Sequence, residues 1–161
     1  MKIRVLGLGN DLLADDRFGI AAATELERQL AGQVEVVYSA TSGFDLMDLV
    51  VGATHLLVLD TLQTGQAEPG SVHEIHEDQV QASGLGPQTS GSPHYVGLFE
   101  ALALGRELGL AVPRRVAIVA VEPADCLTVG GAMSETVASA VFPAVERARG
   151  IIAAWVDAEE V

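Results

Sequence analysis

Short apolar runs alternate along the chain with segments in which apolar positions recur every three to four residues. Apolar, largely β-branched runs occupy residues 3–8, 34–38, 55–59 and 115–121, and each ends at glycine or polar residues, as buried strands do. Residues 15–30, 44–51 and 93–108 carry the helical spacing instead. Residues 71–76 alternate between apolar and polar, which is typical of an edge strand.

The alternation of strands and helices predicts a three-layer α/β/α sandwich around a mainly parallel, twisted sheet of five strands, with one antiparallel edge strand. The runs at 3–8, 55–59 and 115–121 are continuously apolar, so we expect these strands to be central and covered on both faces. No repeat, low-complexity tract or linker interrupts the 161 residues, which predicts one domain over residues 1–161.

Two further segments complete the expected secondary structure. Residues 77–92 are polar and contain several glycines and a proline, which predicts a long loop that is either functional or mobile. A short helix is expected around Val137 and Val141, and Pro143 is expected to open a separate last helix, because proline suits the first helical position. The buried stripe of that last helix would comprise Val145, Ala148, Ile152 and Trp155.

The charge composition excludes some classes of binding partner. Nine basic residues against 22 acidic ones give a net charge of −13, which argues against a nucleic-acid backbone or an anionic membrane surface as the partner. A single cysteine, Cys126, cannot form an internal disulfide. No apolar run reaches the ~20 residues of a membrane span, and the amino-terminal segment lacks the pattern of a signal peptide. We expect a cytoplasmic, monomeric protein.

Ligands of such folds bind at the carboxyl ends of the parallel strands. The polar residues that follow the expected strands are therefore the candidate site residues. They are Asn10, Asp11, Asp15 and Asp16 after the first strand, Ser39, Thr41, Ser42 and Gly43 after the second, Asp60 after the third and Glu122 after the fifth. His94, near the start of the helix expected at 93–108, could reach the same edge.

A dinucleotide site is the first alternative, because Gly7 and Gly9 follow the first strand. The Rossmann fingerprint needs a third glycine three residues later, where this chain has Leu12, and no acidic residue ends the second strand to bind a ribose. Carboxylates in the turn would also repel a pyrophosphate. A Walker loop, a His-Glu-x-x-His helix and a Gly-x-Ser-x-Gly elbow are all absent from the sequence.

A divalent-cation site is the second alternative. Asp16, Asp60 and His94 offer two oxygen donors and one nitrogen donor, which suit a borderline metal such as nickel or zinc. Three protein ligands leave coordination positions open for water or for another protein's ligands. A purely structural interpretation stays open for each residue, since an aspartate also stabilises a helix amino terminus or caps a turn.

Several segments, taken in order, resemble the hydrogenase maturation endopeptidase family. The resemblance rests on residues 7–19, which include Gly7, Gly9, Asn10, Asp15, Asp16 and Gly19; on Thr41, Ser42 and Gly43; on Asp60; on Pro93 and His94; and on Glu122 and Pro123 with Gly130 and Ser134 downstream. It extends over essentially the whole chain.

The resemblance implies a peptidase that removes the C-terminal extension of a nickel-iron hydrogenase large-subunit precursor. It implies that Asp16, Asp60 and His94 are the metal-contacting and catalytic residues, and that the nickel is carried by the substrate and reports that loading has occurred. Another divalent metal is expected to substitute in vitro. Asn10, Asp15, Thr41, Gly43 and Glu122 are predicted to contact the substrate.

One segment departs from the family pattern. Many relatives carry Asp-Gly-Gly before the Thr-x-Gly turn, whereas this chain has Tyr38, Ser39 and Ala40.

Two functions from other classes also stay open: a module that docks on a metalloprotein without cleaving it, and a nucleotide-binding α/β enzyme.

Overall fold

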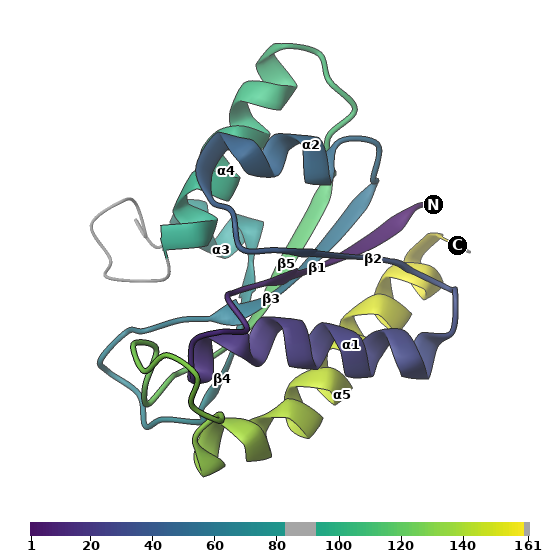
Figure 1. The fold of residues 1–161 in the computed structure, drawn as a ribbon. Helices are drawn as coiled ribbons and strands as arrows, with labels where there is room; N and C mark the ends of the chain where they lie inside the picture. The colour runs from purple at the N-terminus through teal and green to yellow at the C-terminus, as the bar shows by residue number, and fades with distance from the viewer. Residues whose placement is uncertain (83–92, 160–161) are drawn as a thin grey trace.

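The computed structural model describes residues 1–82 and 93–159, and it describes the side chains of all of these except 80–82 and 93–96. A five-stranded sheet forms the centre of the molecule, with helices on both of its faces (Figure 1). The strand order is β2-β1-β3-β5-β4. The predicted three-layer fold with a mainly parallel sheet is therefore confirmed.

Four strands run parallel and one runs against them. β1 (Ile3–Leu8) pairs with β2 (Glu35–Ser39) on one side and with β3 (His55–Thr61) on the other, and β3 pairs with β5 (Arg115–Val121). β4 (Val72–His76) is an edge strand antiparallel to β5. Every residue of β1 and β3 is buried, which confirms the central position expected from their continuous apolar character.

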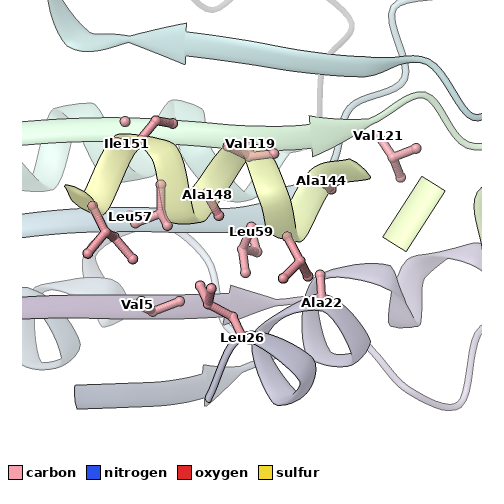
Figure 2. Close-up of a cluster of buried hydrophobic side chains, with 14 of the residues drawn as sticks. Val5, Ala22, Leu26, Leu57, Leu59, Val119, Val121, Ala144, Ala148 and Ile151 are labelled. Carbon is pink, nitrogen blue, oxygen red and sulfur yellow. The ribbon is translucent and has the colours of Figure 1, made fainter. Parts of the chain in front are cut away.

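Side chains on the two faces of the sheet contribute to two separate hydrophobic cores. α1 (Phe18–Leu30) and α5 (Glu135–Glu159) cover one face, where Leu57 and Leu59 of β3 lie (Figure 2). The 3-10 helix η2 (Gly43–Leu46), α2 (Met47–Val50) and α4 (Pro93–Glu107) cover the other face, where Leu56 and Val58 lie. The period of two along β3 therefore decides which helical layer each of its residues meets.

Two expectations about helices were wrong. The predicted loop at 77–92 begins as a helix, α3 (Glu77–Ala82), while the remainder of that loop, 83–92, lies outside the described residues. Pro143 does not open a helix but lies inside α5, which runs unbroken across it. Pro143 and Ser139, whose carbonyl loses its helical donor, both lie on the exposed side of α5, so water can satisfy that carbonyl.

The start of α1 lies directly against the ends of two strands. A Cβ atom at Gly19 would overlap the carbonyl oxygens of Leu8 and Leu59. Only glycine allows this approach. The 3-10 helix η1 (Asp15–Arg17) immediately precedes α1, so the close approach brings η1 to the carboxyl ends of β1 and β3. None of the helices within 1–82 and 93–159 is long and apolar enough to cross a membrane.

Candidate functional site

The candidate site lies where the strand order changes direction. From β1 the chain moves to β2 at one side of the sheet, and β3 then pairs with the other side of β1. Loops that leave β1 and β3 at their carboxyl ends therefore diverge, and the space between them is the usual ligand position of an open α/β sheet. Asp16, from η1, and Asp60, near the end of β3, come from these two segments.

Thr61 connects the two predicted carboxylates. Its backbone N–H donates to Oδ1 of Asp60 at 2.8 Å, and its hydroxyl donates to Oδ1 of Asp16 at 3.3 Å. Asp60 is fully buried, whereas Asp16 is partly exposed. The structure thus brings Asp16 and Asp60 to one end of the sheet, as expected from their positions after strands. Thr61 was missed, although its place directly after Asp60 in an otherwise apolar strand was a signal.

The turn after β1 is shaped around Asp16. The backbone N–H of Asn10 donates to Oδ2 of Asp16 at 3.0 Å. Gly9 has φ +140, and a Cβ atom at this position would overlap the carbonyl oxygen of Asp16. The space beside the glycine-rich turn is therefore filled by the chain's own η1 segment. This contact explains Gly9 without a pyrophosphate and disfavours the dinucleotide alternative.

His94, the third predicted metal ligand, lies in the first turn of α4, one turn before the buried Leu98. α4 packs on the face of the sheet that holds Val58 and Leu62. Asp60 is two residues from each of them along the chain, so the period of two in a strand puts it on the same face. The side chain of His94 lies outside the described part of the structure, so its participation stays a prediction. Among the side chains that are described, no three of His, Cys, Asp and Glu form a group that could hold a metal ion.

The start of α4 is held at the carboxyl end of β2 by a contact between two glycines. A Cβ atom at Gly97 would overlap the Cα atom of Gly43, which follows β2 and has φ +67. Thr41, two residues before Gly43, is exposed, and its backbone N–H and hydroxyl both bond the hydroxyl of Ser39, at 3.0 and 2.7 Å. Ser39 therefore stabilises the turn locally at one of the positions where the chain departs from the family pattern.

The Asp15 side chain forms its hydrogen bonds inside the protein. It is fully buried, and its carboxylate accepts hydrogen bonds from the backbone N–H groups of Ala124 and Asp125, both at 2.8 Å, and from the backbone and hydroxyl of Ser134. These bonds fasten the loop that follows β5 to the start of η1. Asp15 therefore positions the loop after β5 relative to η1. Contact between Asp15 and the substrate stays a prediction.

Glu122 holds a second loop in the same way. Its buried carboxylate accepts hydrogen bonds from the backbone N–H groups of Thr64 and Gly65 and from the Thr64 hydroxyl, and it lies 3.2 Å from Nε2 of His73. Burial opposes ionisation of Glu122, but the hydrogen bonds from Gly65 and Thr64 outweigh it and hold the pKa of this carboxyl below its usual range. The loop after β3 is therefore fixed to the end of β5.

Asn10, also predicted to contact the substrate, organises the turn that leads to Asp16. Its side-chain oxygen accepts from the backbone N–H of Leu12 at 3.0 Å, and its carbonyl accepts from the backbone N–H of Leu13 at 3.1 Å. Substrate contact by Asn10, Thr41 and Gly43 stays a prediction.

Cys126 lies beside the acidic residues of the site but has a thiol of low reactivity. Burial raises the pKa of this thiol to about 11, and the negative charge of Asp16 acts in the same direction, against a hydrogen bond with Thr61. The thiol is thus protonated at neutral pH, where a cysteine nucleophile has to be a thiolate. The site therefore favours chemistry carried by carboxylates over a cysteine-peptidase mechanism.

Comparison with known proteins identifies the family of this chain. Residues 20–151 match the model of the hydrogenase maturation protease family. The chain is 30% identical to the hydrogenase 2 maturation protease of Escherichia coli over 149 residues, which cover 91% of this chain and 88% of that protein. It is 33% identical to the hydrogenase expression/formation protein HupD of Thiocapsa roseopersicina, and the match covers 91% of this chain and 66% of HupD.

The fold has solved counterparts. The hydrogenase maturating endopeptidase HybD from E. coli superposes with a TM-score of 0.79 at 28% identity, covering 98% of this chain and 94% of that one. The maturation protease HybD from Thermococcus kodakarensis, at 23% identity and a TM-score of 0.74, shares the fold. The match to the family model over residues 20–151 shows that the chain belongs to the hydrogenase maturation protease family.

Proposed function

We propose that the protein is an endopeptidase that removes the C-terminal extension of a nickel-iron hydrogenase large-subunit precursor after nickel has been inserted. The observation that carries the proposal is the connection of Asp16 and Asp60 through Thr61 at the switch point of the sheet. Family membership supports the class of reaction, and α4, which carries His94 in its first turn, packs on the face of the sheet that holds Val58 and Leu62.

In this proposal the nickel belongs to the substrate. Carboxylate oxygens of Asp16 and Asp60 and an imidazole nitrogen of His94 make a donor set that suits a borderline divalent ion. Asp16 is partly exposed, so an ion held by another protein can approach it from solvent. Only a precursor that has received its nickel would then be held with its C-terminal segment across the site, which makes nickel the recognition element.

Hydrolysis requires water to add to the carbonyl carbon of the scissile peptide while the C–N bond breaks. A carboxylate of the site, Asp16 or Asp60, accepts a proton from the attacking water, and that proton passes to the leaving amine. The negative charge that develops on the carbonyl oxygen also needs stabilisation by a positive charge or by hydrogen-bond donors. The raised pKa of the Cys126 thiol supports this assignment of the proton transfer to carboxylates.

The test uses purified precursor in nickel-loaded and nickel-free forms, with the released peptide measured by mass spectrometry. The wild-type protein should cleave only the loaded form, and Asp16→Ala, Asp60→Ala and His94→Ala should each lower the cleavage rate by ~100-fold or more, as loss of an acid–base or ligand residue does. Asp45→Ala, which removes an exposed carboxylate from η2, is the matched control and should cleave like the wild type.

Cleavage at wild-type rates by all three site variants would overturn the assignment of the residues. Binding of the precursor with no change in its C-terminal mass would instead show a docking module that does not cleave. Equal cleavage of loaded and nickel-free precursor would leave a peptidase but remove nickel as its recognition element.

A further inference from the structure

Two loops beside the candidate site hold large apolar side chains in solvent. Leu12, in the turn after β1, is 64% exposed, and Leu127 and Val129, in the loop after β5, are 88% and 76% exposed. Single exposed apolar residues are common on soluble proteins, but several on neighbouring segments mark an interaction surface. We call these three residues the apolar tip.

The two loops of the apolar tip are bonded to each other. Leu13 and Val129 form an isolated antiparallel bridge, the N–H of Ala14 donates to the carbonyl of Thr128 at 3.0 Å, and the N–H of Gly130 donates to the carbonyl of Leu12 at 2.8 Å. Figure 1 shows the loop after β5, in green, beside the start of α1 at the end of the sheet where the strands point. Segments more than a hundred residues apart in the sequence thus present one apolar surface.

The apolar tip is also fixed relative to the carboxylates of the site. The backbone N–H of Asp15 donates to the carbonyl of Asp125 at 2.7 Å, and the N–H of Asp125 donates back to the Asp15 carboxylate at 2.8 Å. The carboxylate of Asp125 in turn accepts the N–H groups of Leu127 and Thr128, at 2.9 and 3.0 Å. The exposed leucine and valine are therefore carried by an ordered loop that is tied to the residue before Asp16.

We propose that the apolar tip is the surface on which the folded body of the precursor docks while its metal-bearing segment enters the site. This inference rests on the proposed function. Leu12 precedes Asp16 by four residues, so a protein whose bound ion reaches Asp16 has to cover the loops around it. Apolar area covered in this way contributes binding free energy that does not depend on the scissile bond.

Charge defines the partner surface further. Asp11 is exposed next to Leu12, and the chain carries a net charge of −13. The complementary surface is therefore an apolar patch bordered by lysine or arginine side chains, which would also speed the encounter of the two proteins at low salt. A second copy of this acidic chain is the less suitable occupant, because both copies would bring the same charge.

The test compares a tip variant with a variant of three exposed leucines elsewhere. Leu12→Gln, Leu127→Gln and Val129→Thr are combined in one protein, and Leu104→Gln, Leu108→Gln and Leu110→Gln are combined in the control. The control residues lie at the end of α4 and in the loop after it, and Leu108 is 63% exposed, close to the value for Leu12. Both sets are surface changes, so thermal unfolding should be unaltered in both proteins.

For the tip variant we expect KM for nickel-loaded precursor to rise ~10-fold or more with kcat within twofold of the wild type, since the tip binds the substrate body and takes no part in the chemistry. The control should match the wild type in both constants. An unchanged KM, or a loss confined to kcat, would overturn the inference. Loss of a wild-type dimer in the tip variant, with unchanged processing, would assign the tip to self-association and overturn it as well.

Direct binding of the precursor separates this inference from the proposed function. If the wild type binds precursor but cleaves none, the proposed peptidase activity fails. Weaker binding by the tip variant than by the control variant would still support docking on the tip. Equal binding by both variants would overturn the docking surface whether or not cleavage occurs.

Discussion

The carboxylate of Asp15 accepts two hydrogen bonds from Ser134, one from its backbone N–H at 2.7 Å and one from its hydroxyl at 3.0 Å. These residues are 119 positions apart, and the bonds close the loop after β5 onto the start of η1. Asp15 and Asp16 are adjacent in sequence but serve opposite purposes. Asp15 is fully buried and binds the loop after β5, whereas Asp16 is partly exposed and accepts a hydrogen bond from Thr61.

Replacing Asp15 with asparagine should destabilise the fold. The carboxylate receives four hydrogen bonds, and an amide group in its place would turn N–H donors towards the backbone N–H groups that now donate to it. We expect the free energy of unfolding to fall by about 3 kcal/mol, the size of effect produced by unsatisfied buried polar groups. Urea denaturation measures this change.

Ser134→Ala is the matched control for Asp15→Asn. It removes the hydroxyl bond to Asp15 and a 3.4 Å hydroxyl contact with Thr136 but keeps the backbone bond to Asp15, so it should cost about 1 kcal/mol. Equal stabilities of Asp15→Asn and the wild type would show that the four bonds do not hold the loop.

Gly19→Ala should be far more damaging than an alanine elsewhere in a helix. The new Cβ atom would overlap the carbonyl oxygens of Leu8 and Leu59 and push α1 away from the ends of β1 and β3. We expect a loss of about 3 kcal/mol or more, on the order of severe overpacking. Thermal unfolding followed by circular dichroism is the measurement.

Gly150→Ala supplies the comparison for Gly19→Ala. Gly150 lies in α5, and apart from its chain neighbours and the backbone of its own helix, no atom of the described residues lies within 4 Å of the place that an alanine Cβ would take. Alanine there should therefore raise stability by about 0.5–1 kcal/mol through helix propensity. Similar effects of the two substitutions would contradict the close approach of α1 to the sheet.

Thr61→Val should impair processing while leaving the fold intact. Valine keeps the shape of the side chain and the backbone bond to Asp60 but removes the hydroxyl that bonds Asp16. We expect kcat on nickel-loaded precursor to fall by about tenfold, because a misplaced carboxylate loses orientation. Thr61→Ser retains the hydroxyl and should restore the rate, and failure of this rescue would argue that Thr61 acts only through packing.

His55 should make stability depend on pH. The imidazole is buried against Trp155, with ring centroids 5.1 Å apart, and bonds Thr54 through Nδ1, while its buried Nε2 has no hydrogen-bond partner among the described residues. Burial lowers the pKa of His55 from its usual 6.5. Below pH 6.5 the unfolded chain then binds a proton that the folded chain does not, so the free energy of unfolding falls as the pH is lowered.

His55→Phe removes this titration and keeps an aromatic ring against Trp155. The slope of unfolding free energy between about pH 7 and pH 5 should therefore become flatter in this variant, as measured by urea titrations at several pH values. An unaltered slope in His55→Phe would place the responsible group elsewhere.

The fold was predictable because most of its strands are short apolar runs that end at glycine or polar residues and alternate with helical segments. The run at 115–121 coincides with β5, and residues that follow strands did meet at one end of the sheet. The internal roles of Asp15 and Glu122 were not predictable, since their partners lie far away in sequence and the acidic residues resemble site residues. The continuity of α5 past Pro143 was missed because local rules treat proline as a boundary, whereas a solvent-facing proline is tolerated.

The contact between Gly43 and Gly97 has a consequence for how the site responds to its surroundings. Backbone atoms alone set the separation between the turn after β2 and the start of α4, with no side chain between them. Neither proton uptake nor salt acts on such a contact, so α4 keeps its distance from β2 when conditions change. The helix that carries His94 therefore begins at a position that backbone packing alone sets.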